Sequence, residues 1–109
     1  MATNYKVLGQ SNPAATTATA LYTVPSSTSA VCSTLVICNM GVSTTFRVAI
    51  RKAGEALAAD DYLCYDSPVA GNDSIFLTLG ITLATTDIVS IYAGTANVAF
   101  NLFGSEITA

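Results

Sequence analysis

Hydrophobic and polar residues alternate with a period of two over much of this chain. Phe46, Val48 and Ile50 alternate with Thr, Arg and Ala, and similar alternation occurs in 75–79 and 98–103. Side chains of a β-strand point alternately to its two faces, so this pattern predicts strands with one buried and one exposed face. The stretch 31–38 is apolar on both faces toward its end, which predicts a central strand covered from two sides.

Turn-forming Gly, Pro, Asn, Asp and Ser separate the apolar runs at short and fairly even spacing. The expected strands cover residues 4–10, 19–24, 30–39, 44–52, 61–66, 73–79, 87–93 and 97–107. Seven to eight short strands of this kind predict an all-β fold, a single antiparallel β-sandwich, Ig-like or jelly-roll-like, as one domain over residues 1–109.

Two segments do not follow the strand pattern. Glu55 to Asp61 is the only helix candidate and is too short for more than one turn. Asn12 to Ala20 is rich in Ala and Thr and carries no charge. It is either a loop that packs along a neighbouring molecule or the segment that crosses between the two sheets.

The chain of 109 residues is 51% hydrophobic and only 10% charged. A small domain exposes much of its surface and normally covers it with charged side chains. We therefore expect a surface of Ser, Thr, Asn and Gly, part of which is covered by copies of this chain or by another protein. Four basic residues and a net charge of −3 argue against a nucleic-acid partner.

No apolar run is long enough to span a bilayer, so no membrane partner is expected. The start of the chain lacks a basic segment followed by an apolar one, which predicts a protein without a secretory signal that is made and kept in a cytoplasm.

The residue types exclude most catalytic arrangements. The chain has no histidine, so a Ser-His-Asp or Cys-His site cannot form. A Ser-Lys pair would have to use Lys6 or Lys52, which read as isolated charges in strands. The glycines are single and form no phosphate-binding loop. We therefore expect a protein that is not an enzyme, with no catalytic residues and no cofactor.

Three cysteines give an odd count. Cys32 and Cys38 lie in one predicted strand, too far apart for a disulfide, while a bridge from Cys64 to either one is geometrically allowed. We expect three buried thiols that act as small hydrophobic residues. Without a CxxC pair or a histidine, no zinc or other metal site is expected.

Aspartates and tyrosines are the remaining candidates for chemistry. Asp60, Asp61, Asp66, Asp73 and Asp87 would suit a calcium or paired-acid site, but each lies where a turn residue bonds its own backbone, which is the favoured interpretation. Tyr22, Tyr62, Tyr65 and Tyr92 would form either a sugar-binding platform or, as favoured, core and interface contacts. Arg47 and Arg51 share one strand face and should pair with acids of a neighbouring strand or subunit.

Short strand and turn motifs extend over nearly the whole chain. They are Tyr5-Lys-Val-Leu-Gly-Gln10, Leu21-Tyr-Thr-Val-Pro25, Ser33-Thr-Leu-Val-Ile-Cys-Asn39, Thr45-Phe-Arg-Val-Ala-Ile-Arg51, Asp61-Tyr62 through Asp66, Asn72-Asp-Ser74, Leu77-Thr-Leu-Gly80, Asp87-Ile-Val-Ser-Ile-Tyr92 and Phe100-Asn-Leu-Phe-Gly-Ser-Glu-Ile107. Together they resemble a family of small structural proteins of tailed bacteriophages, including phages of cyanobacteria and other aquatic bacteria. The resemblance implies a virion component and carries no catalytic motif.

The expected function is therefore a non-enzymatic capsid decoration (cement) protein, assembled in the bacterial host cytoplasm and located in the virion, where it bridges and stabilises capsomers. Its expected partners are itself, as a homo-oligomer with a trimer favoured, and the major capsid protein or other virion proteins. The alternatives are a tail, neck, baseplate or fibre-associated component, and a carbohydrate-binding adhesion module. The candidate interface residues are Pro13, Thr16, Thr17, Arg47, Arg51, Phe103, Glu106 and Ile107, within the Asn12–Ala20 segment, the Arg47/Arg51 face and the tail from Phe103 to Ala109.

Overall fold

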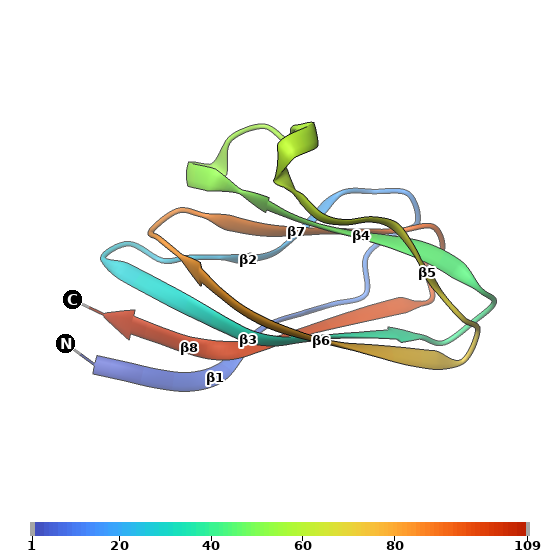
Figure 1. Cartoon of the computed structure of the whole chain (residues 1–109), viewed down its shortest axis with the longest axis horizontal. Helices are drawn as coiled ribbons and strands as arrows, with labels where there is room; N and C mark the ends of the chain where they lie inside the picture. The colour runs from blue at the N-terminus through green and yellow to red at the C-terminus, as the bar shows by residue number, and fades with distance from the viewer. Residues whose placement is uncertain (1, 109) are drawn as a thin grey trace.

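Two four-stranded antiparallel sheets are stacked face to face in the computed structural model, which describes residues 2–108 (Figure 1). The eight strands are β1 (Ala2–Ser11), β2 (Thr19–Thr23), β3 (Thr28–Asn39), β4 (Thr44–Arg51), β5 (Tyr62–Val69), β6 (Asp73–Leu83), β7 (Ile88–Ala93) and β8 (Val98–Thr108). The predicted all-β sandwich is confirmed. None of the described helical segments is long and apolar enough to cross a membrane.

The order of the strands identifies the kind of sandwich. Sheet A has the order β1-β8-β3-β6, and sheet B has the order β2-β7-β4-β5. The first strand therefore pairs with the eighth, the second with the seventh, the third with the sixth and the fourth with the fifth. This is the pattern of one long hairpin rolled into two sheets, which is a jelly roll rather than an Ig-like sandwich.

The core lies between the sheets and consists of the apolar residues of the alternating pattern. Val98, Phe100 and Leu102 of β8 point inward and are fully buried. Phe46 of β4 meets Phe100 across the layers, with ring centroids 6.3 Å apart in an edge-to-face arrangement. Burial of such side chains is the main force that holds the two sheets together.

Strand β6 continues past the predicted end at residue 79. The sequence indicates a turn at Gly80, but Gly80 lies inside the strand with φ +74° and forms a bulge, where the register with β3 shifts between Cys32 and Thr34. Glycine takes this left-handed conformation without a Cβ clash, so the strand resumes and ends at Leu83. Strand β5 likewise includes Pro68, because an edge strand tolerates a residue without an N–H.

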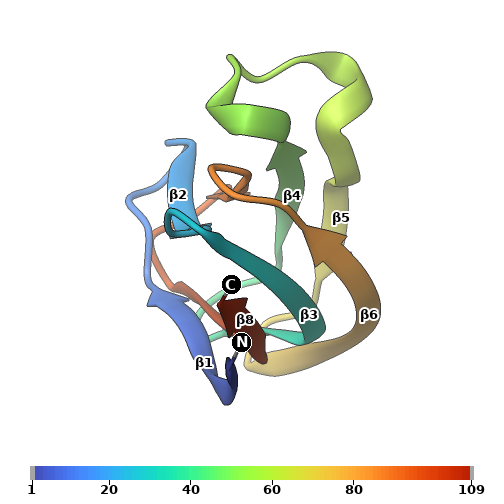
Figure 2. The same ribbon diagram turned by 90° about the vertical axis from the view of Figure 1, so that its left-hand side faces the viewer.

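The helix candidate at residues 55–61 forms no more than the one turn expected of it, a 3₁₀ turn at Ala59–Asp61. Two 3₁₀ turns, η1 (Lys52–Gly54) and η2 (Ala59–Asp61), stand at the ends of an excursion between β4 and β5. A segment this short gains too few hydrogen bonds to offset helix nucleation. The carboxylate of Asp61 instead accepts a hydrogen bond from the Ala58 N–H at 2.9 Å. The excursion projects from sheet B, away from sheet A (Figure 2).

Strand β3 is central, between β8 and β6, but is covered on one side only. Val36 and Cys38 face outward and are partly exposed, because the sandwich has no third layer among the described residues. Cys32 faces the core and is buried, whereas Cys38 and Cys64 are partly buried, and all three are free thiols. The prediction of three buried thiols therefore holds for Cys32 alone.

Residues 12–18 cross from sheet A to sheet B, which is one of the two roles expected for this segment. The Asn12 amide donates to the carbonyls of Ala96 and Val98, at 2.9 and 2.8 Å, and the Thr16 N–H donates to the Ala93 carbonyl at 2.8 Å. These bonds attach the crossing segment to the β7–β8 turn and to the end of β7.

Candidate functional site

Among residues 2–108, the outer face of sheet A carries no charged side chain. It carries Tyr5 and Val7 of β1, Phe76 of β6 and Phe103 of β8, interspersed with Ser and Thr. Tyr5 is 86% exposed and Phe76 is 71% exposed. We call the outward-facing residues of β1, β8, β3 and β6 the neutral face.

The charges lie elsewhere on the described chain. Lys6 and Glu106 of sheet A point inward, toward each other, and Asp73 stands at the start of β6, where its carboxylate accepts a bond from the Ser74 N–H. Most other charged residues belong to β4, β5 and the excursion between them. The molecule thus has one neutral face and one charged face, an asymmetry that solubility alone does not require.

The four edge strands are poorly suited to pairing with another strand. Strands β1, β2 and β5 have register shifts in their only pairing, β5 also contains Pro68, and β6 has the Gly80 bulge. Such devices hinder edge-to-edge association. If this protein assembles, its faces are better surfaces for contact than its edges.

Arg47 stands at the centre of an aromatic cluster on the outer face of sheet B. Its guanidinium carbon lies 4.2 Å from the ring centroid of Tyr65 and 4.2 Å from that of Tyr92. Its Nε donates to Asp66 Oδ1 at 2.7 Å and its Nη2 to Asp66 Oδ2 at 3.3 Å. This bond raises the pKa of Arg47 and lowers the pKa of Asp66. The expected partner for Arg47, an acid of a neighbouring strand, is confirmed.

A pocket of about 240 Å³ lies next to this cluster because small residues occupy the adjacent row of the sheet. In that row Ala49 of β4 pairs with Ser90 of β7 on one side and Tyr62 of β5 on the other. Arg47 and Tyr92, which pair in the neighbouring row, form one wall. The remaining lining residues are Thr16, Ala18, Leu57 and Ile91.

Arg51 holds the excursion that brings Leu57 to this pocket. Its Nε donates to the Glu55 carbonyl at 2.7 Å and its Nη2 donates to the Gly54 carbonyl at 3.1 Å. In the described chain no acid of a neighbouring strand pairs with Arg51, because the nearby chain end of η1 offers unpaired carbonyl oxygens instead; the alternative, an acid of a neighbouring subunit, stays a prediction. The Asp87 carboxylate adds a second attachment, at 2.8 Å from the Ala53 N–H.

The aspartates mostly act as turn residues, as the sequence indicates. Asp61, Asp73 and Asp87 accept hydrogen bonds from backbone N–H groups close to strand ends. Asp66 differs because it pairs with Arg47. Within residues 2–108, no group of three or more carboxylate or thiol side chains is placed to hold a metal ion.

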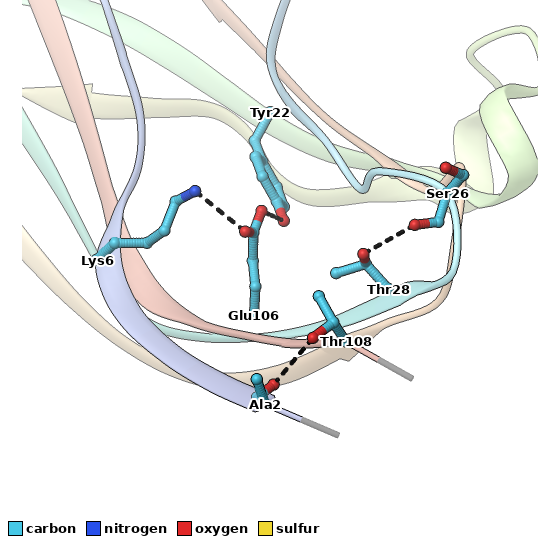
Figure 3. Close-up of polar contacts among 7 residues, drawn as sticks. All are labelled: Ala2, Lys6, Tyr22, Ser26, Thr28, Glu106 and Thr108. Carbon is cyan, nitrogen blue, oxygen red and sulfur yellow. Dashed lines mark hydrogen bonds and ion pairs between the residues drawn. The ribbon is translucent and has the colours of Figure 1, made fainter.

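Glu106 joins the two sheets at the end of the sandwich near the chain termini (Figure 3). Its Oε2 accepts a hydrogen bond of 2.6 Å from the Tyr22 hydroxyl, and its Oε1 accepts one of 3.0 Å from Lys6 Nζ. These donors lower the pKa of Glu106, while burial and the neighbouring carboxylate raise that of Tyr22. Lys6 is therefore not an isolated charge, and Lys52 lies in η1 rather than in a strand.

The sequence-predicted interface residues do not form one surface. Thr16 and Arg47 line the pocket on sheet B, and Arg51 braces it. Phe103 belongs to the neutral face, on the opposite side of the molecule, and Ile107 shares its strand. The carboxylate of Glu106 is engaged internally.

The two remaining candidates do not belong to either surface. Pro13 and Thr17 lie in the crossing segment, and the predicted tail is mostly strand β8, with Ala109 outside the described residues. Sequence reasoning missed Tyr5, Val7 and Phe76, although each is an apolar residue at an outward position of its strand.

Comparisons with known proteins give no further assignment: no family model, no curated protein and no solved structure matches this chain.

Proposed function

We propose that this protein is a non-enzymatic structural protein of a tailed bacteriophage virion, and specifically a capsid decoration protein. The observation that carries the proposal is the neutral face, which exposes Tyr5, Val7 and Phe76 without a charged side chain. A surface of this kind can be buried against another protein without leaving a charge unpaired. The resemblance of the sequence to phage structural proteins points to the same class.

The size of the neutral face suits a specific contact. The two sheets are stacked along the molecule's principal axis of intermediate length. The neutral face is therefore bounded by the other two principal axes, which are 44 Å and 19 Å long (Figure 1). The largest area that these two axes allow is comparable to the about 800 Å² that each partner buries in a standard protein interface. Eight-stranded jelly rolls are also common in viral capsid proteins, although fold alone does not establish function.

We infer that the neutral face is covered by copies of this chain in a homo-oligomer, with a trimer favoured. A face without charge does not repel an identical molecule, and closed symmetry uses one interface repeatedly. In the particle, many modest contacts to the major capsid protein then act together. The charged excursion beyond sheet B remains in solvent.

Light scattering on the purified chain tests the oligomer. Phe76→Lys introduces a charge into the neutral face and should lower the measured mass to that of a monomer. Leu63→Lys is the matched control, because Leu63 is also an exposed apolar residue but lies on sheet B, and it should leave the mass unchanged. A wild-type chain that is monomeric at high concentration, or a Phe76→Lys chain that keeps the oligomer, would count against this assignment.

Copy number in purified virions tests the location. A decoration protein should be present in hundreds of copies per particle, whereas a tail, neck, baseplate or fibre component should be present in about 6 to 18 copies, as tail symmetry dictates. Reconstruction of the particle should show the neutral face buried. A low copy number would instead support the tail alternative, in which the same face makes the contacts.

A further inference from the structure

We propose that the pocket on the outer face of sheet B binds one sugar ring of an uncharged glycan, and that the hollow beside it takes the adjoining unit. This site lies on the opposite side of the sandwich from the neutral face, so the proposal does not rest on the proposed role in assembly.

The pocket is formed by residues of the sheet whose positions are fixed by their neighbours. Ala49 and Ser90 form its floor, yet they are only 2% and 4% exposed, because taller neighbours surround them. Arg47 is fixed by Asp66 and by two aromatic rings, and Arg51 anchors the excursion at Gly54 and Glu55, shortly before Leu57. Walls that are already fixed reduce the entropy lost when a ligand binds.

The lining of the pocket combines apolar surface with hydroxyl groups. Ala18, Ala49 and Leu57 present apolar surface, which suits the C–H faces of a sugar ring. Ser90, Tyr62 and Tyr92 also line the pocket, and their hydroxyls have no hydrogen-bond partner in the described part of the chain. Apolar surface with a few converging polar groups is typical of a small-molecule site, and here the polar groups match the hydroxyls of a sugar.

The ion pair between Arg47 and Asp66 determines which ligand charge the pocket favours. Arg47 uses two of its five N–H groups on Asp66, so its positive charge is already compensated while other N–H groups remain free to donate. An anionic ligand would have to compete with Asp66 for this charge. The site therefore favours a neutral ligand rich in hydroxyl groups.

The pocket is the size of a single ring and adjoins a second hollow. Its volume of about 240 Å³ is below the range of about 300–1,000 Å³ found for pockets of drug-sized ligands, which suits a single ring. A second hollow, lined by Leu57, Ala58, Ala59, Tyr62 and Tyr65, shares Leu57 and Tyr62 with the first. A chain of two sugar units can therefore pass from one hollow to the other over Tyr62.

The test is an NMR titration of the full chain with methyl glycosides of neutral hexoses and N-acetylhexosamines, followed by the corresponding disaccharides. We expect at least one of these to shift the amide signals of Ala49 and Ser90 at millimolar concentration. The matching disaccharide should bind roughly tenfold more tightly, since it adds contacts in the second hollow. The signals of Tyr5 and Phe76, on the neutral face, should not move.

Three variants separate the site from a general surface effect. Ala49→Leu fills the floor and should weaken binding by more than about tenfold, while Leu57→Ala removes a wall in an exposed segment and should weaken it roughly threefold. Tyr5→Ala is the control and should bind as the wild type does. Leu57→Ala keeps the test valid if Ala49→Leu does not fold.

The proposal fails if no neutral glycoside shifts the pocket signals, or if folded Ala49→Leu and Leu57→Ala both bind as the wild type does. It also fails if uronic, sialylated or sulfated sugars bind more tightly than their neutral counterparts. None of these results depends on the oligomeric state or on the copy number. The assignment as a decoration protein is therefore tested separately.

Discussion

The hydrogen bond between Tyr22 and Glu106 links the two sheets and allows a quantitative test of the fold. Tyr22 belongs to β2 in sheet B and Glu106 to β8 in sheet A, and both residues are buried (Figure 3). Tyr22→Phe removes the hydroxyl and keeps the ring. The substitution therefore isolates the polar contact from the packing of the aromatic ring.

The expected loss follows from the geometry of this contact. The bond is 2.6 Å long, its acceptor is a carboxylate, and no water can easily replace the donor in a buried position. Hydrogen bonds to charged groups contribute about 1.5–3 kcal/mol to stability. For a domain of this size, a loss of about 2 kcal/mol should lower Tm by roughly 10 °C. Lys6 still pairs with Glu106 in the variant, but its side chain is half exposed and contributes less.

The effect of Tyr22→Phe should also depend on pH. The folded pKa of Glu106 is below its ordinary value of 4.5, so its contribution is complete above that pH and is lost as pH falls through the folded pKa. The folded pKa of Tyr22 is raised above its ordinary value of 10.0, so its contribution is complete below that pH and is lost as pH rises further. The difference in stability between wild type and Tyr22→Phe should be largest between these limits and shrink on both sides.

Urea unfolding followed by circular dichroism, at one protein concentration and over a range of pH, measures this difference. Tyr5→Phe is the matched control, because Tyr5 is exposed and its hydroxyl lies outside any polar network of the described chain. A loss below about 0.5 kcal/mol at neutral pH, which is within the range of ordinary surface substitutions, would refute the reasoning. A difference that stays constant with pH would refute the assignment of the bond to an ionised carboxylate.

Three further predictions concern single residues. The Asn39 amide donates to three backbone carbonyls, the shortest bond being 2.7 Å. Asn39→Asp should therefore lower the free energy of unfolding, measured in urea, by about 3 kcal/mol or more. A smaller loss at neutral pH would contradict this. Gly104→Ala places a Cβ in steric clash with the Val31 carbonyl oxygen and should destabilise the fold more than Gly80→Ala. A Cβ at Gly80 meets no atom within 4 Å, and that substitution costs about 1 kcal/mol from its positive φ; equal losses would exclude the clash. Burial raises the pKa of Cys32 to about 11, so a thiol reagent should modify Cys64, which lies on sheet B, in the native protein and should reach Cys32 only on unfolding, as mass spectrometry of the labelled peptides would show.

Local errors in the strand predictions share one physical cause. Gly80 and Pro68 both indicate turns on their own, because each disfavours a regular strand. In the structure both lie within edge strands, where a bulge or a missing N–H costs little. Whether a strand is at an edge or in the centre depends on the order of the sheet, and that order is not encoded in any short segment.

The candidate site was predictable only in part. The alternation places Arg47 on an outward face, and the sequence order places Thr16 in an uncharged connecting segment. Their meeting at one pocket requires β7 to lie beside β4 and the crossing segment to end beside Ser90. The same applies to Tyr22 and Glu106, which are far apart in sequence and meet because β2 of sheet B lies opposite β8 of sheet A at one end of the sandwich.

The period-two pattern by itself determined that the chain is an all-β sandwich and determined which side chains of β4 and β8 form the core, because alternation is a local property of the strand backbone. Its residue types also determined that no histidine-dependent chemistry is available. Only the tertiary structure decided that the strands roll up as a jelly roll, that one face is neutral while the other carries Arg47 and its aromatic neighbours, and that a pocket lies over Ala49. These features arise from pairing between strands distant in sequence, whose energies depend on the whole arrangement rather than on any one segment.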